Sequence, residues 1–162
     1  MAVTFSIRRS VLTRELNMTT VIEGTIIQGL GAARTTVRLQ MPHLVRQFPQ
    51  VRGCYEATIN LQLDCPLRVN NPDHTTGLIR WYPQASPEWA GEKFSFLGIK
   101  FECPLGEPNR DAWIYIPHDS PHRLNLFLAE IMTLPMDQTY LTPGTRCRIH
   151  VDKSTSSEVL IV

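Results

Sequence analysis

Apolar and polar side chains alternate strictly over residues 57–63, and this alternation limits what the chain can fold into more than any other feature. The apolar positions 59, 61 and 63 share one side, while Thr58 and Asn60 fall on the other. A period of two residues is that of a β-strand with one buried face. The segment therefore predicts a strand on which two short polar side chains lie next to each other.

Further short strands are expected because β-branched and aromatic runs alternate with turns that contain glycine or proline. These runs cover residues 21–28, 35–39, 77–82, 94–103, 112–116 and 146–151. Helices are expected between Pro42 and Pro49, where apolar residues follow helical spacing, and over residues 124–132. Many short strands with few helices predict a mainly β protein, a small closed or nearly closed barrel with one or two short helices.

Length and composition indicate one folded domain. A chain of 162 residues with 43% apolar content can bury roughly 70% of the surface that it exposes when unfolded. Residues 1–20 show no clear helix or strand period and are expected to form an N-terminal extension. The barrel domain is expected over residues 21–152, followed by a C-terminal tail over residues 153–162.

Charge and cysteine content narrow the function classes. The 16 basic residues barely outnumber the 15 acidic ones, so the chain lacks the basic excess of general nucleic-acid and anionic-membrane binders. No apolar stretch approaches the ~18 residues that span a bilayer, and the N-terminus lacks the order of a signal peptide. The cysteines at positions 54, 65, 103 and 147 have no C-x-x-C spacing and are expected to be buried thiols. We therefore expect a cytoplasmic monomer with no nucleic-acid or membrane partner.

A glycine-containing turn follows the first expected strand. Backbone amides of Gly29-Leu30-Gly31 can converge on an anion, with Arg34 as a fixed cation nearby. The turn has neither the G-x-x-x-x-G-K-[ST] pattern of a Walker loop nor the third glycine and following helix of a Rossmann fingerprint. An ordinary hairpin turn and an anion-binding turn both remain open.

Thr58 and Asn60 have two interpretations. Polar residues are normal on the solvent face of a half-buried strand. The hydroxyl and amide oxygens also suit Mg²⁺, which keeps several waters and takes its charge balance from substrate phosphates. No histidine stands in an H-E-x-x-H pattern and no serine in G-x-S-x-G, so zinc-protease and serine-hydrolase chemistry have no support.

A series of short motifs, in order and spacing, resembles the archaeal CTP-dependent riboflavin kinases from about residue 21 to 152. The motifs are Ile22-Glu23-Gly24, Gly29-Leu30-Gly31 with Arg34, Gly53, Thr58-Ile59-Asn60-Leu61-Gln62-Leu63-Asp64, Gly98-Ile99-Lys100 and Ile114-Tyr115-Ile116-Pro117. The resemblance implies a six-stranded cradle-loop β-barrel. It also implies transfer of the CTP γ-phosphoryl group to riboflavin with Mg²⁺, which gives FMN and CDP.

The resemblance also assigns site residues. It implies that Thr58 and Asn60 bind magnesium, and that Ser120 and Glu130 bind the flavin, with Leu128 at the glutamate position if the alignment is read without a gap. The nucleotide-binding positions that it implies are Gly29, Leu30, Gly31, Ala32, Ala33 and Arg34, with Leu134, Pro135 and Met136 in a second stretch. Ala33 and Ala57 stand where the family has glycine.

Two alternatives to a kinase stay open. One is a non-catalytic relative that binds a nucleotide or a flavin-like ligand without turnover. The other is an interaction or DNA-binding barrel that uses the arginines at positions 8, 9 and 14 as a basic arm. The residues alone do not identify a general base, and Glu130 is a candidate both for that role and for a flavin contact.

Overall fold

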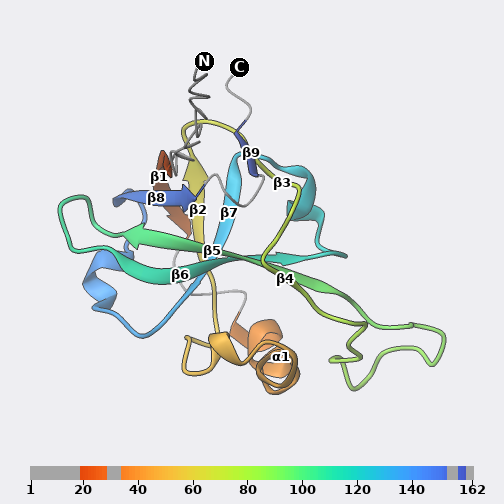
Figure 1. Cartoon of the computed structure of the whole chain (residues 1–162). Coiled ribbons are helices and arrows are strands. Elements are labelled where there is room, and N and C mark those ends of the chain that lie inside the picture. The colour runs from red at the N-terminus through yellow and green to blue at the C-terminus, as the bar shows by residue number, and fades with distance from the viewer. Residues whose placement is uncertain (1–18, 29–33, 153–156, 160–162) are drawn as a thin grey trace, which may run out of the picture.

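A closed barrel of six antiparallel strands forms the centre of the computed structural model, which describes residues 19–28, 34–152 and 157–159 (Figure 1). The strands are β1 (Thr19–Gln28), β2 (Ile59–Leu63), β5 (Phe94–Glu102), β6 (Arg110–Pro117), β7 (Leu128–Thr133) and β8 (Arg146–Asp152). Their order is β5-β6-β7-β2-β1-β8, and a further β5–β8 pairing closes the ring. The expectation of a mainly β protein with a small closed barrel is confirmed.

Shorter elements surround the barrel. The strand pair β3 (Leu67–Val69) and β9 (Ser157–Val159) forms a separate small sheet, and β4 (His74–Thr75) pairs with β5 in antiparallel orientation. One α-helix, α1 (Arg34–Gln47), lies below the barrel in Figure 1. The 3₁₀ turns are η1 (Pro49–Val51), η2 (Pro121–Leu124) and η3 (Gln138–Leu141).

Strand β5 separates two hydrophobic cores, because nearly all of its residues are buried. Leu97, Ile99 and Phe101 belong to the cluster that fills the barrel. Phe94 and Phe96 belong instead to the cluster that packs α1 against the outside of the barrel. The apolar side chains of α1 thus hold the helix against one wall of the barrel.

The strand expected over residues 35–39 is wrong, because these residues lie in α1. The β-branched run from Thr35 to Val37 favours a strand by local propensity. The buried apolar side chains of the segment, however, are Val37, Met41, Leu44 and Phe48, which follow the spacing of one helix face. Burial of that face outweighs the local preference, and the helix continues through Pro42.

The helix expected over residues 124–132 is also wrong. Residues 128–133 form β7, which pairs with β2 on one side and β6 on the other. Without this strand two neighbouring strands would keep unpaired backbone groups, and such groups are costly to bury. The strand expected over residues 77–82 is reduced to one antiparallel bridge between Ile79 and Glu92.

Two described strands include residues outside the range expected for the barrel domain. Strand β1 begins at Thr19, inside the expected extension, and β9 lies within the expected tail. Cys54, Cys103 and Cys147 are buried free thiols, as expected, whereas Cys65 is a partly buried free thiol. In the ranges that the structure covers, no helix combines the length and apolar character that crossing a bilayer requires.

Gly24 is expected to tolerate no side chain. A Cβ atom there would lie 2.7 Å from the Gln62 carbonyl oxygen and 2.8 Å from Leu61 Cγ, both on the paired strand β2. We expect Gly24→Ala to lower the free energy of unfolding by about 1–3 kcal/mol through overpacking, as measured by urea denaturation. Gly77→Ala is the control, since its nearest neighbour would be the end of Gln47 at 3.6 Å. Equal stabilities of the two variants would contradict the prediction.

Candidate functional site

A cavity of about 510 Å³ lies where the first turn of α1 meets the barrel wall. Four residues singled out from the sequence line it: Thr58, Asn60, Ser120 and Glu130. The other lining residues are Thr36, Val37, Gln40, Trp81, Trp89, Glu92, Tyr115, Pro117, Asp119 and His122. The fold thus brings the expected magnesium and flavin positions into one cavity.

Pairing of β2 with β7 brings three of these side chains together. Asn60 and Glu130 are directly opposite each other in the antiparallel register, so their side chains share one face. The Thr58 hydroxyl donates a hydrogen bond to Glu130 Oε1 over 3.4 Å. Thr58 is 3% exposed, which places its oxygen in the cavity wall and not on an open solvent face.

Burial raises the pKa of the Glu130 carboxyl above its ordinary value. Charge on His122 and the hydrogen bond from Thr58 oppose this shift without cancelling it. A carboxyl group with a raised pKa in a cavity can exchange a proton with a bound hydroxyl more readily than an exposed one. Glu130 is therefore a carboxyl group with a raised pKa in the wall of the cavity.

Tyr115 ties the cavity wall to α1. Its hydroxyl donates to Gln40 Oε1 over 2.5 Å, and Gln40 is a buried residue of α1. Burial raises the pKa of Tyr115, and the negative charges of Glu130 and Glu92 raise it further. The phenol is therefore a neutral hydrogen-bond donor that positions the helix.

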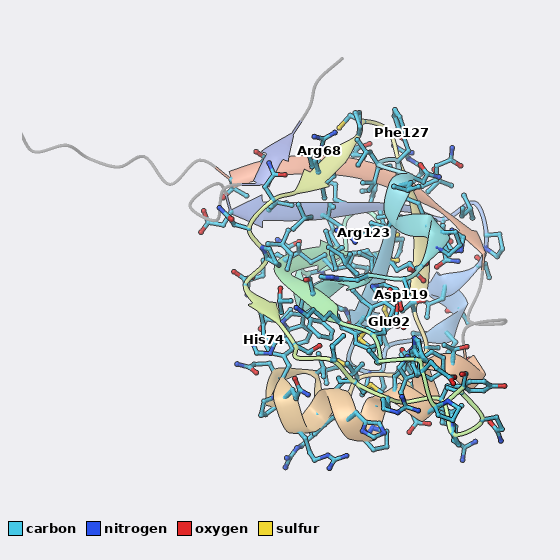
Figure 2. The ribbon with its side chains drawn as sticks, turned by 90° about the vertical axis from the view of Figure 1, so that its right-hand side faces the viewer. Arg68, His74, Glu92, Asp119, Arg123 and Phe127 are labelled. Carbon is cyan, nitrogen blue, oxygen red and sulfur yellow. The ribbon has the colours of Figure 1, made fainter. Side chains whose placement is uncertain are left out.

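Ser120 enters the cavity from the connection between β6 and β7. It caps the 3₁₀ turn η2, since its Oγ accepts the His122 backbone N–H over 3.2 Å. The same connection carries Asp119, whose backbone N–H donates to Glu92 Oε1 over 2.9 Å. Figure 2 shows Glu92 and Asp119 beside each other. The connection is therefore fastened to the segment before β5.

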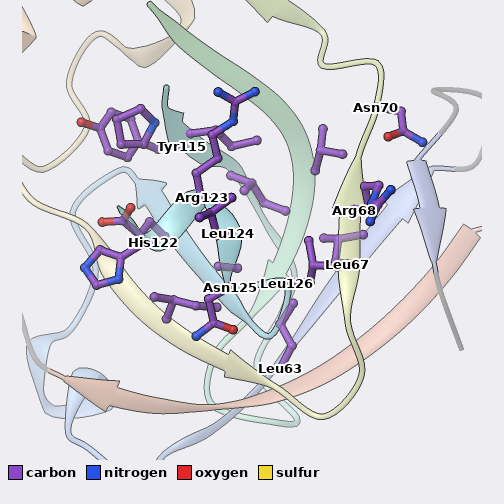
Figure 3. A pocket seen from close by; sticks show the side chains of 17 residues that line it. Leu63, Leu67, Arg68, Asn70, Tyr115, His122, Arg123, Leu124, Asn125 and Leu126 are labelled. Carbon is purple, nitrogen blue, oxygen red and sulfur yellow. The ribbon is translucent and has the colours of Figure 1, made fainter. Parts of the chain in front are cut away.

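A second cavity of about 410 Å³ adjoins the first and shares Tyr115, Pro117, His122 and Glu130 with it. Figure 3 shows Arg123 and Asn125 on one side of this hollow, with Arg68 and Asn70 on the opposite side. Its lining also includes apolar residues such as Leu63, Leu67, Ile114 and Ala129. Glu130 thus lines both cavities, the first with acidic and aromatic side chains in its wall and the second with arginines and apolar side chains.

The oxygen donors of the first cavity fit magnesium. Thr58, Asn60 and Glu130 offer a hydroxyl, an amide and a carboxylate oxygen, the ligand types that Mg²⁺ takes from proteins. Among the described residues there is no cluster of three or more His, Cys, Asp or Glu side chains that would hold a metal ion. A metal bound here would thus rely on few protein ligands and on substrate oxygens, and the magnesium site stays a prediction.

The expected nucleotide-binding residues are only partly described. Gly29, Leu30, Gly31, Ala32 and Ala33 lie outside the described residues, and Arg34 is described only as the first residue of α1. Thr36, in the first turn of that helix, does line the cavity. The first turn of a helix has backbone N–H groups without intrahelical partners, and these suit an anion. The first turn of α1 thus lines the same cavity as Thr58 and Asn60.

The second expected nucleotide stretch lies outside the cavity lining. Leu134, Pro135 and Met136 follow β7, and Met136 is held by Tyr55, whose hydroxyl bonds both its carbonyl oxygen and its N–H. Leu134 is half exposed, and its Cδ2 atom would lie 3.5 Å from a Cβ atom added at Gly53. Their role in nucleotide binding stays a prediction.

Sequence reasoning missed Trp81, Trp89 and Glu92 as cavity residues. Residues 77–82 were expected to form a strand, and no role was assigned to the loop that follows. The available signal was that two of the three tryptophans lie eight positions apart in a polar, proline-containing segment. Only the fold shows that this segment turns back onto the cavity.

Glu130 is expected to make stability fall as pH rises. The unfolded carboxyl titrates near its ordinary pKa, about 4.3, whereas burial raises the pKa in the folded protein. Below the unfolded pKa the Glu130 carboxyl is neutral in both states. As pH rises through the folded pKa, the folded state must carry a buried charge, and stability falls. We expect Glu130→Gln to abolish that loss. The unfolding free energy of the variant should therefore increase relative to that of the parent as pH rises.

Urea denaturation at a series of pH values, without metal or nucleotide, measures this difference. Carboxyls with lowered pKa produce the opposite slope but are common to both proteins, so they cancel; they are Glu23, Asp64, Glu88, Glu102 and Asp137. A difference that does not change with pH would contradict the assignment.

Comparison with models of known protein families and with curated protein sequences finds no match to this chain.

Proposed function

We propose that the protein is a CTP-dependent riboflavin kinase, which uses Mg²⁺ to transfer the γ-phosphoryl group of CTP to riboflavin and gives FMN and CDP. One observation carries the proposal. Thr58, Asn60, Ser120 and Glu130, the positions that the resemblance links to metal and flavin, line one cavity, although 72 residues separate Thr58 from Glu130. Nothing in the local pattern of either segment requires them to meet.

The residues of the cavity have distinct parts in this reaction. Thr58 and Asn60 would hold the magnesium ion, which neutralises charge on the phosphate oxygens when bound. The N–H groups of the first turn of α1 would donate hydrogen bonds to phosphate oxygens. Most of the catalysis is then positioning, because phosphoryl transfer demands little covalent help from the protein.

The bond changes balance without further reagents. The 5′-hydroxyl oxygen of the ribityl chain forms a bond to the γ-phosphorus as the bond to the β,γ-bridging oxygen breaks, and CDP leaves. The hydroxyl proton goes to a carboxylate or to solvent. Glu130 would receive it or contact the flavin, and its raised pKa is compatible with either role.

A second candidate is a relative that binds a flavin without catalysis. The described part of the cavity wall holds Glu92, Asp119 and Glu130 but neither lysine nor arginine. Such a wall accepts a triphosphate only if a metal or residues beyond the described wall supply positive charge. An uncharged flavin ring needs no such compensation.

One assay separates the two candidates. The protein is incubated with riboflavin, Mg²⁺ and each of CTP, ATP and GTP, and FMN is separated from riboflavin by chromatography. We expect FMN with CTP alone. No FMN with any donor would refute the kinase, and riboflavin binding without turnover would then support the flavin-binding relative.

A further inference from the structure

Two tryptophans form part of the cavity wall although they belong to the loop between β4 and β5. Trp81 and Trp89 are both half buried and line the cavity together with Glu92. Their ring centroids are 6.0 Å apart and their planes are perpendicular. We call this pair the tryptophan corner. The two indoles pack edge to face, and both contribute to the wall of one cavity.

The base of the loop is closed by backbone pairing. Ile79 and Glu92 exchange two backbone hydrogen bonds of 2.9 Å each. Gly91 makes this closure possible, since its φ is 105° and a Cβ atom there would lie 2.8 Å from the Ile79 backbone. The two ends of the loop are therefore held together next to β5.

Arg80 fastens the far side of the loop. Its guanidinium donates to the carbonyl oxygens of Ser86 at 3.2 Å and Pro87 at 3.3 Å, and also to that of Trp89. The guanidinium carbon lies 6.0 Å from the centroid of the Trp89 ring. An arginine with these partners restrains the backbone that carries Trp89. The indole is thus held in place before any ligand binds.

Glu92 orients the other indole. Trp81 Nε1 donates to Glu92 Oε2 over 2.9 Å, while Glu92 Oε1 accepts the Asp119 backbone N–H over 2.9 Å. Glu92 is 5% exposed, so both of its oxygens are bound within the protein. The carboxylate therefore fixes the Trp81 ring and is already used as an acceptor. Both walls of the corner are preorganised.

We propose that the tryptophan corner stacks against a planar, uncharged heteroaromatic ring. Preorganised aromatic faces at a cavity bind flat π-systems by stacking, and they do so with little loss of conformational entropy. A cation is the other ligand that aromatic walls can hold. It fits less well here, because Arg80 already lies near Trp89 and both oxygens of Glu92 are occupied.

Where that ring is the isoalloxazine of riboflavin, the inference rests on the proposed function and adds residues to it. The acceptor ring would lie against the tryptophan corner, with its chain directed toward Glu130 and Thr58 in the same cavity. Trp81 and Trp89 would then select for flat acceptors, and small aliphatic alcohols would be poor substrates.

Binding of lumichrome, the planar dimethylalloxazine that has the three-ring system of a flavin but no ribityl chain, tests the proposal. The probe's fluorescence is followed as protein is added, because stacking on an indole quenches its emission. We expect Trp81→Leu and Trp89→Leu each to raise the Kd by about tenfold or more. Trp113→Leu is the matched control, since this third tryptophan does not line the cavity, and its Kd should stay within about twofold of the parent's.

Each outcome supports or overturns the proposal. Unchanged Kd values in Trp81→Leu and Trp89→Leu, no binding of lumichrome by the parent, or displacement of lumichrome by tetramethylammonium would each overturn it. If a leucine variant fails to fold by circular dichroism, Trp81→Phe and Trp89→Phe replace it, and an unchanged Kd in these would count equally against the proposal.

The experiment also separates this inference from the kinase assignment. Lumichrome binding that depends on Trp81 and Trp89, without FMN formation from any donor, would refute the kinase and leave the ring site standing. FMN formation with an unchanged KM for riboflavin in both leucine variants would support the kinase and refute the ring site.

Discussion

Replacing Thr58 and Asn60 together by alanine is expected to abolish Mg²⁺-dependent nucleotide binding and to lower FMN formation by about a hundredfold or more. The substitutions remove the two neutral oxygen donors beside Glu130 in the cavity wall. The remaining carboxylate would have to hold the metal alone. Calorimetric titration with Mg²⁺ and CTP measures binding, and the chromatographic assay measures turnover.

Gln62→Ala is the matched control for this double variant. Gln62 lies on the same side of β2, two positions after Asn60, but it is exposed and does not line the cavity. Asn60→Asp keeps an oxygen ligand and should retain metal-dependent binding. Binding of Mg²⁺ and CTP by the double variant with unchanged affinity would refute the metal assignment.

Replacing Phe96 by alanine is expected to have the largest effect on stability, a loss of about 3–5 kcal/mol in the free energy of unfolding. Phe96 is 0% exposed and stacks on Phe48 with ring centroids 4.8 Å apart. It also lies against Tyr115, with centroids 6.1 Å apart. The substitution would leave a cavity between α1 and the barrel.

Urea denaturation followed by far-ultraviolet circular dichroism measures this loss. Phe127→Ala is the control, because Phe127 is 45% exposed and its removal should change stability by no more than about 0.5 kcal/mol. Since Tyr115 lines the site, Phe96→Ala should also weaken lumichrome binding. A loss below about 1 kcal/mol would show that α1 is not packed as described.

Only part of the candidate site could be predicted from the sequence. Thr58 and Asn60 could be paired because a two-residue period acts over short range and needs no partner strand to be recognised. Glu130 was identified through the resemblance alone, and the local pattern around it favoured a helix. Its position opposite Asn60 depends on the register between β2 and β7, which are far apart in the chain.

Trp81 and Trp89 could not be identified as cavity residues from the sequence. Their loop has no periodicity, and its shape depends on hydrogen bonds from the Arg80 side chain to the backbone carbonyls of Ser86 and Pro87 in the same loop. Such contacts leave no trace in residue spacing. Tryptophan content alone gives no indication of whether an indole lies in a core or at a cavity.

Local patterning by itself determined the barrel class and the strands β1, β2, β5, β6 and β8, because alternation along a strand reflects burial of one face. Tertiary structure decided the identity of α1 and β7 and the composition of the cavity. In α1 a buried helical face outweighed β-branched propensity, and in β7 the open edges of β2 and β6 required a strand between them. In both places the free energy of packing and pairing between distant segments exceeds the preference of the local sequence, and that energy is absent until the chain closes.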